Sequence, residues 1–281
     1  MENEQWDLVL EPKRGLFDLH LREVIRYRDL VWLFVKRDFV TQYKQTILGP
    51  LWFIINPIFS TIIYTFVFGN LAEIGTDGIP FLLFYYAGTM LWTFFTGCFN
   101  DASNIFLINA GLFGKVYFPR LTVPIGNVFS NLTKVGIQFA TLMVFFAYYL
   151  LTGAPIRPSW WAFGFPLLFI WIAFIATGMG MIISSLTTKY RDLKHLIGFA
   201  LHLAMYATPV VYPLSQIPKD YAWVSYANPV SAPVELFRIW FYGEGTVPPL
   251  MIASSLGMTA GFMILGLVMF NQNERNYIDV V

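Results

Sequence analysis

The chain has 281 residues, of which 57% are hydrophobic, 19% are aromatic and 12% are charged. Ordinary soluble domains carry about 25% charged residues, so a composition this apolar excludes a soluble fold. The net charge of +1 says nothing about nucleic acid, which we do not expect as a partner. The single cysteine, Cys98, excludes an internal disulfide and a cysteine-based metal cluster. Several uncharged stretches reach the roughly 20 residues needed to cross a bilayer core of about 30 Å. The composition therefore predicts an all-α integral membrane protein.

The N-terminal region precedes the first of these apolar stretches. Residues 1–20 are polar and lack the apolar segment of a signal peptide, so we expect a cytoplasmic tail. Over residues 21–47, apolar side chains share one face and cations lie opposite, which predicts an amphipathic helix at the membrane interface. The apolar face holds Val31, Trp32, Val35, Phe39 and Tyr43, and the polar face holds Arg37, Thr41 and Lys44.

Six apolar stretches within residues 48–275 predict six transmembrane helices, followed by a cytoplasmic tail over residues 276–281. The expected spans are 50–71, 79–99, 124–151, 162–186, 194–213 and 249–270. Pro50 would begin the first span, where a missing N–H is harmless, and Pro57 would kink it. Fourteen of the 18 Lys and Arg residues lie in segments that share one side, so the positive-inside rule predicts that both termini are cytoplasmic.

Small residues recur every four positions in two spans, which predicts close helix packing. They are Ala176, Gly180 and Ser184 in span four, and Gly257 and Gly261 in span six.

Two connections are too long for simple turns. Residues 100–119 place Phe106, Ala110 and Phe113 on one face, which predicts a short cytoplasmic helix suited to docking a partner. Residues 213–249 are rich in aromatic side chains, which predicts short extracytoplasmic re-entrant helices before the last span. This second connection also carries Glu235 and Arg238 at a spacing of three.

Polar side chains recur on one face of span three. Asn127, Asn131, Lys134 and Gln138 fall within about 60° of one another at 100° per residue. Two interpretations are open for this stripe. Lys134 either extends toward the cytoplasmic interface from a helix that starts early, or faces a water-lined path through the membrane.

Spans one and five each present a face that mixes rings with polar groups. Such a face suits a conduit for a sugar chain, because rings stack on the apolar faces of sugars while polar groups bind hydroxyls. The candidates are Trp52, Asn56, Phe59 and Phe66 in span one, and Phe199, His202 and Tyr206 beside Asp192 and His195 in span five. The alternative is that these rings face lipid or neighbouring helices.

Motifs for catalysis are missing from the sequence. It contains no GxxxxGK[ST] loop to cradle a phosphate, no HExxH and no GxSxG. His195 and His202 are seven residues apart with only Asp192 near them, which disfavours a metal site. We therefore expect a non-enzymatic chain that binds no cofactor itself.

Three segments of the chain carry a resemblance to a known family: RDFVTQYKQTILGPLWFIINP, NAGLFGKVYFPRLTVP and ANPVSAPVELFR. They resemble the permease subunit of ATP-binding-cassette type-2 polysaccharide exporters, and O-antigen permeases most of all, over about residues 20–275. It implies a homodimer in the bacterial inner membrane, with two copies of a cytoplasmic ATPase that would hold ATP and Mg²⁺. The substrate would be a polyprenyl-pyrophosphate-linked glycan, moved outward from the cytoplasm.

The resemblance also implies roles for individual residues. The substrate would enter at the Leu48–Gly49 bend, where Arg37 and Lys44 would attract its pyrophosphate or, alternatively, bind anionic lipid. A coupling helix would contact the ATPase, and the second connection would lie at the exit. The coupling candidates are Asp101, Phe106, Asn109, Leu112, Phe113 and Lys115, and the exit candidates are Glu235 and Arg238.

O-antigen is the favoured substrate, with capsular polysaccharide or teichoic acid as alternatives. Two other classes of protein stay open: an integral-membrane transferase acting on polyprenyl-linked sugars, and an ion-coupled carrier.

Overall fold

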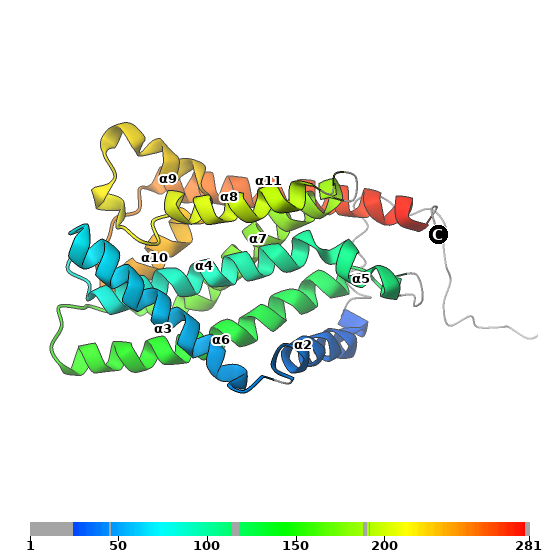
Figure 1. The fold of residues 1–281 in the computed structure, drawn as a ribbon. Helices are drawn as coiled ribbons and strands as arrows, with labels where there is room; N and C mark the ends of the chain where they lie inside the picture. Colours follow the sequence, from blue (N-terminus) through cyan, green and yellow to red (C-terminus); the bar gives the residue numbers. More distant parts are fainter. Residues whose placement is uncertain (1–24, 45, 114–117, 188–189, 191, 279–281) are drawn as a thin grey trace, which may run out of the picture.

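Helices form the framework of the computed structural model, which describes residues 25–44, 46–113, 118–187, 190 and 192–278 (Figure 1). No strand occurs within these ranges. The longer helices are α2 (Arg28–Tyr43), α3 (Trp52–Tyr64), α4 (Phe81–Ser103), α6 (Thr122–Leu151), α7 (Phe165–Thr187), α8 (Leu193–Ala207), α10 (Ser231–Tyr242) and α11 (Pro249–Ile278). The shorter elements are η1 (Gly49–Leu51), the π-helical turns of η2 (Thr65–Leu71), α5 (Ile105–Phe113), η3 (Trp160–Gly164), η4 (Leu214–Gln216), η5 (Lys219–Tyr221) and α9 (Trp223–Ala227). The predicted all-α class is confirmed.

Five helical segments of the described chain are long and apolar enough to cross a membrane. They are Gly49–Leu71, Phe81–Ser103, Thr122–Leu151, Trp160–Thr187 and Pro249–Gln272. Each overlaps a predicted span, and the ends differ by at most four residues. The first segment starts at η1, whose first turn contains Pro50, because a helix start tolerates a residue without an N–H.

The predicted fifth span, 194–213, is a shorter helix than expected. α8 has 15 residues, which corresponds to about 22 Å and falls short of a bilayer core of about 30 Å. The helix stops because Thr208 precedes Pro209, and the ring of a proline disfavours helical geometry at the residue before it. Thr208 accordingly has extended backbone angles, φ −100° and ψ 142°.

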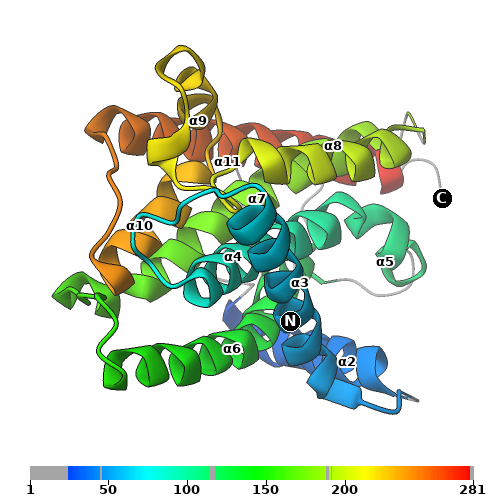
Figure 2. The ribbon, with the colours of Figure 1, turned by 60° about the vertical axis from the view of Figure 1, so that its left-hand side comes forward.

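α4 is the central helix of the bundle. In Figure 2 it lies behind α3 and between α6 and α8. Every residue from 83 to 92 is buried, as expected of a helix that is apolar on all sides. α6 and α7 pack against α4, and α11 packs against α7. The core of the protein is therefore built around this one helix.

Glycines bring the helices of the core close together. A Cβ atom at Gly180 of α7 would lie 2.8 Å from the Phe99 carbonyl oxygen of α4, so the predicted small-residue seam of span four is confirmed. The seam predicted for span six is different, because Gly257 and Gly261 face open space. Instead, a Cβ atom at Gly266 would lie 2.5 Å from the Gly178 carbonyl oxygen, which marks the crossing of α7 and α11.

A second buried cluster closes the end of the bundle that carries α2, α5 and the C-terminal part of α11 (Figure 1). Its members are Phe34, Ile105, Phe106, Phe118, Val123, Met181 and Phe270. α2 runs alongside α6, because Phe34 meets Gly126 and, one turn further along both helices, Asp38 meets Ser130. The buried face of α2 is centred on Phe34 and Val35, whereas Trp32 is 69% exposed and lies off this face.

Candidate functional site

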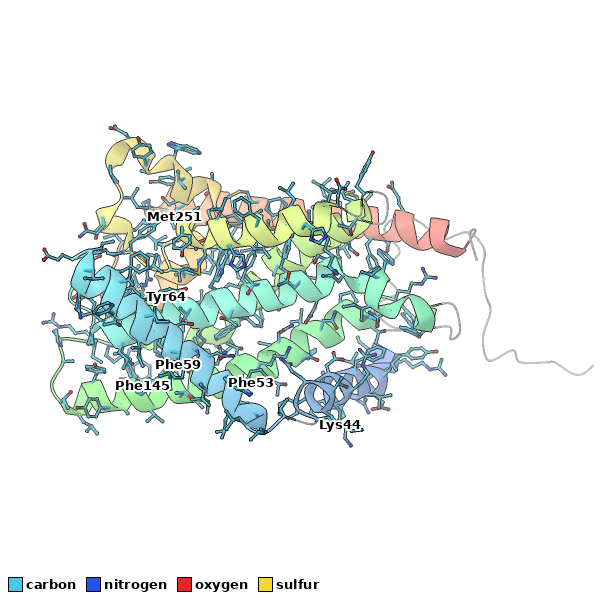
Figure 3. The ribbon with its side chains drawn as sticks, in the orientation of Figure 1. Lys44, Phe53, Phe59, Tyr64, Phe145 and Met251 are labelled. Carbon is cyan, nitrogen blue, oxygen red and sulfur yellow. The ribbon has the colours of Figure 1, made fainter. Side chains whose placement is uncertain are left out.

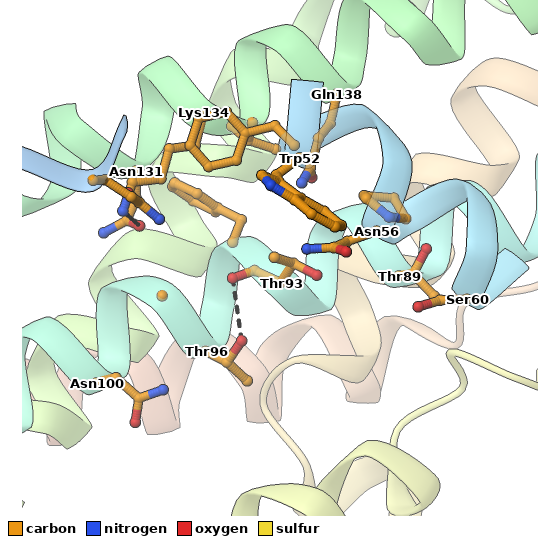
Figure 4. A pocket seen from close by; sticks show the side chains of 16 residues that line it. Trp52, Asn56, Ser60, Thr89, Thr93, Thr96, Asn100, Asn131, Lys134 and Gln138 are labelled. Atoms are coloured by element: carbon orange, nitrogen blue, oxygen red, sulfur yellow. Dashed lines mark hydrogen bonds between the residues drawn. The ribbon is translucent and has the colours of Figure 1, made fainter. Parts of the chain in front are cut away.

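A polar cavity lies between α3, α4 and α6 (Figure 4). Its volume of about 340 Å³ falls within the range of roughly 300–1,000 Å³ that is usual for small-molecule sites. Each helix contributes side chains spaced three or four residues apart, which places them on one face. The polar lining residues are Gln42, Asn56, Ser60, Thr89, Thr93, Thr96, Asn100, Asn131, Lys134 and Gln138.

The α4 wall of the cavity carries hydroxyl groups. Thr96 Oγ1 donates to the Trp92 and Thr93 carbonyl oxygens at 3.0 and 3.1 Å, and Thr89 Oγ1 donates to the Tyr85 carbonyl oxygen at 2.8 Å. Threonines inside helices often bond back in this way. Because their protons are used within the helix, these hydroxyls present lone pairs to the cavity and act there as acceptors.

The α6 wall carries the charged and amide groups of the stripe predicted in span three. Asn131 Nδ2 donates to Asp101 Oδ2 of α4 at 2.6 Å, and Lys134 Nζ donates to Asn131 Oδ1 at 3.3 Å. Gln138 is buried one turn further along and also lines the cavity. Lys134 borders the cavity, which is the position that the second interpretation of this stripe requires.

Gly97 leaves room for this network. A Cβ atom at Gly97 would lie 2.6 Å from Asn131 Oδ1, so any larger residue there would displace the amide. Nothing in the sequence marked Gly97 for this role, because the contact depends on how α4 and α6 face each other.

The α3 wall carries Trp52 and Asn56, which were predicted to line a channel. Both are exposed toward the cavity, and Figure 4 shows the Trp52 ring between Asn131 and Asn56. Phe53 also lines it, near the start of α3 (Figure 3). Gln42, at the end of α2, was missed by the sequence analysis although it borders the same space.

The remaining channel candidates do not line this cavity. Phe59 of α3 and Phe66 of η2 are exposed away from it, and Phe199, His202 and Tyr206 are exposed on α8. The predicted channel residues thus fall into two groups. Trp52 and Asn56 line the cavity, and the others are exposed elsewhere on α3, η2 and α8.

The residues predicted for substrate entry, Arg37, Lys44, Leu48 and Gly49, lie near the corner between α2 and α3. Arg37 forms a salt bridge with Asp38 at 2.8 Å, and its guanidinium lies 4.9 Å from the centre of the Phe34 ring. Lys44 is exposed at the end of α2 (Figure 3), and Leu48 is exposed as well. Gly49 starts η1 with φ +50°, a conformation that glycine adopts without strain. None of these four residues lines the cavity.

The predicted coupling residues are divided between two helices. Asp101 belongs to α4 and faces Asn131, not the outside. In α5, Phe106 is buried against the Phe270 ring of α11 with centroids 4.9 Å apart, and Asn109 Nδ2 donates to the Ile105 carbonyl oxygen at 3.0 Å. The side chains of Leu112 and Phe113, and all of Lys115, lie outside the described residues.

The outward face of α5 is apolar and differs from the face expected. Leu107 and Ile108 are 65% and 67% exposed, whereas Phe106 is 2% exposed. The sequence pattern grouped Phe106 with the docking surface because α5 is apolar all round, so its periodicity does not mark the outer side. Any partner that binds α5 here meets Leu107 and Ile108.

The predicted exit pair is buried. Arg238 Nη1 donates to Glu235 Oε2 at 2.8 Å, and Nη2 donates to the Val210 carbonyl oxygen at 3.1 Å. The guanidinium carbon of Arg238 also lies 3.7 Å from the centre of the Phe84 ring of α4. Because both charges are about 1% exposed, the pair joins α10 to α4 and to the segment after α8 and does not border an opening.

Tyr242 also links α10 to α4. Its hydroxyl donates to the Leu83 carbonyl oxygen of α4 at 3.2 Å. Burial raises the pKa of the Tyr242 hydroxyl, and the nearby Arg238 lowers it only in part, so the group stays a hydrogen-bond donor.

Helices long and apolar enough to cross a membrane, with a polar cavity between three of them, are what a membrane permease requires. The chain belongs to the ABC-2 type transporter family, which it matches over residues 29–242. It is 28% identical over 257 residues to the O-antigen export system permease protein RfbA of Klebsiella pneumoniae, covering 90% of this chain and 95% of that protein.

Two further relatives are similar over most of their length. The O-antigen export system permease protein RfbA of Myxococcus xanthus is 26% identical over 243 residues, which cover 85% of this chain and 90% of that protein. The polysialic acid transport protein KpsM of Escherichia coli is 23% identical over 248 residues, which cover 85% and 91%. The family is one of transporter permeases, and the predicted resemblance is confirmed.

Proposed function

We propose that the chain is the membrane-spanning subunit of an ATP-driven exporter of a polyprenyl-pyrophosphate-linked polysaccharide, with O-antigen favoured. It would lie in the bacterial inner membrane with both termini in the cytoplasm, as the distribution of Lys and Arg indicates. The names of the relatives in Klebsiella and Myxococcus support O-antigen. The relative named for polysialic acid transport supports an acidic capsular polysaccharide as the second candidate.

The polar cavity carries this proposal. Amide and hydroxyl groups inside a membrane protein are costly unless they find partners, so they mark paths for polar substrates. The cavity offers amides from Asn56 and Asn131, hydroxyls from Thr89 and Thr96, and the exposed Trp52 ring. Sugars present both hydroxyl groups and apolar faces, and this combination suits them.

A second copy of the chain would complete the path. Large apolar side chains are exposed along α3 and α8, which leaves two faces that lipid or another subunit must cover. They are Phe59, Ile62 and Ile63 on α3 with Phe66 on η2, and Leu196, Phe199, Leu203 and Tyr206 on α8. A homodimer joined through these faces would place the two cavities near a shared axis.

A cytoplasmic ATPase would act through α5. Two copies of that partner would hold ATP and Mg²⁺, and each would bind the exposed Leu107 and Ile108. Only Asn104 separates α4 from α5, so a displacement of α5 would move the end of α4 that carries Asp101. Asp101 in turn binds Asn131 at the wall of the cavity.

Deletion of the chromosomal gene tests the proposal. Loss of the surface polysaccharide, with lipid-linked polymer accumulating in the cytoplasm, would support an exporter. An inactive ATPase in the partner subunit should give the same phenotype, which separates this reading from an ion-coupled carrier. Normal surface polysaccharide in the deletion strain, or glycan transfer by the purified chain, would contradict the proposal.

A further inference from the structure

Lys134 is a cation within α6, one of the helices that are long and apolar enough to cross a membrane. It lies 12 residues after the start of that helix, a rise of about 18 Å. Its Nζ atom donates to Asn131 Oδ1 at 3.3 Å and forms no salt bridge within the described part of the chain. Asn131 stands between Lys134 and Asp101, so the carboxylate is bound to the amide and not to the ammonium. The ammonium group thus has donors available for an anion in the cavity.

Gln138 supplies the complementary group one turn away. Its side chain is 4% exposed and lines the cavity, yet its Oε1 atom has no hydrogen-bond partner among the described residues. A buried acceptor without a donor is destabilising, so a ligand that brings a donor would bind favourably there. Residues four apart on a helix are neighbours, so Lys134 and Gln138 can bind two groups of one molecule.

The volume of the cavity and its α3 wall further restrict which ligands can bind. Trp52 of α3 offers an exposed ring, and Asn56, one turn further along α3, is also exposed and lines the cavity. A volume of about 340 Å³ is at the lower end of the range for small-molecule sites, so it suits one sugar ring with an attached group at a time.

We propose that the cavity binds a glycosyl phosphate, with the phosphate at Lys134, a sugar hydroxyl donating to Gln138 Oε1 and the sugar ring against Trp52. The proposal rests on the proposed function, because the ligand would be the first sugar and the phosphate of the exported lipid. It shifts the anion-binding role from Arg37, which Asp38 already neutralises, to Lys134. Lys134 would thereby determine the position of the sugar-phosphate end of the substrate during transport.

Binding to the purified protein in nanodiscs of zwitterionic lipid tests the site. The probes are farnesyl diphosphate linked to N-acetylglucosamine, the farnesyl glycoside without phosphate, and farnesyl diphosphate alone. Lys134→Gln should weaken binding of both diphosphate probes about tenfold or more, as expected for one charge-assisted hydrogen bond, and should leave the neutral glycoside unchanged. Lys134→Arg should retain binding. Gln138→Leu should weaken the two sugar probes only.

Lys194→Gln is the matched control, because it removes an exposed cation of α8 that does not line the cavity. Failure of the wild type to bind the sugar diphosphate would overturn the proposal, and so would equal binding by Lys134→Gln. Equal weakening of the neutral glycoside would also overturn it, since that indicates a general loss of structure. Displacement of the probe by an equal concentration of phosphatidylglycerol would overturn it in favour of a phospholipid headgroup site.

Export in cells separates this inference from the proposed function. If the wild-type gene restores surface polysaccharide but Lys134→Gln binds the probe normally, the site is wrong and the function stands. If the deletion strain exports normally while binding still requires Lys134, the function is wrong and the anionic sugar site stands.

Discussion

Asn131 binds Asp101 across the interface of α4 and α6, with Nδ2 and Oδ2 2.6 Å apart. The other end of the same amide accepts the hydrogen bond from Lys134. α4 ends two residues after Asp101, and α5 begins at Ile105. One amide therefore connects the end of the bundle that carries α5 with the cavity.

Gly97→Ala tests whether the Asn131 amide contributes to stability and export. Because the new Cβ would lie 2.6 Å from Asn131 Oδ1, the side chain must move and both hydrogen bonds weaken. We expect a loss of about 1–3 kcal/mol in stability, typical of overpacking, and a clear fall in surface polysaccharide. Thermal unfolding in detergent and immunoblotting of the polysaccharide measure the two effects. Gly136→Ala on α6 is the control, since its Cβ would meet open space; identical behaviour of the two variants would contradict the prediction.

Arg238→Ala should destabilise the protein by roughly 3–5 kcal/mol, because it leaves the Glu235 carboxylate buried without its partner. The double variant Glu235→Leu with Arg238→Met should be milder, since no charge is left unpaired. Thermal unfolding in detergent gives both values. A stable Arg238→Ala protein that has lost only export would instead support the exit role predicted from the sequence.

Leu107→Glu with Ile108→Glu should abolish co-purification of the ATPase subunit while the permease stays folded. The two side chains are exposed, so charges there disturb a docking surface and not the core. Phe106→Ala is the matched comparison on the same turn and should cost about 3–5 kcal/mol in stability, because Phe106 stacks on Phe270. An ATPase that still binds the double glutamate variant would exclude this surface as the coupling site.

Five of the six predicted spans coincide with helices that are long and apolar enough to cross a membrane, because apolar length is a local property, whereas α8 is shorter than its predicted span. The polar stripe of Asn131, Lys134 and Gln138 was also predicted from spacing, and it forms one wall of the cavity. Polar residues in an apolar helix carry this information because they are rare and must face protein or water.

Apolar residues carried less information, since lipid and protein core are both apolar. Phe59 and Asn56 of α3 were predicted to share a channel face, yet the cavity includes only Asn56. Phe106 was predicted to face outward but is buried, and this prediction failed for the same reason. Arg238 could not be placed because its partners, Val210 and Phe84, are distant in the sequence.

Photo-cross-linking from α3 tests most directly whether the cavity is on the substrate path. A photo-reactive amino acid would replace Asn56, which lines the cavity, or Phe59, which is one turn away and exposed outside it. In cells that synthesise the lipid-linked polysaccharide, we expect the protein labelled at position 56 to acquire glycan and the protein labelled at position 59 to acquire little. Strong cross-linking from position 59 with none from position 56 would contradict the account.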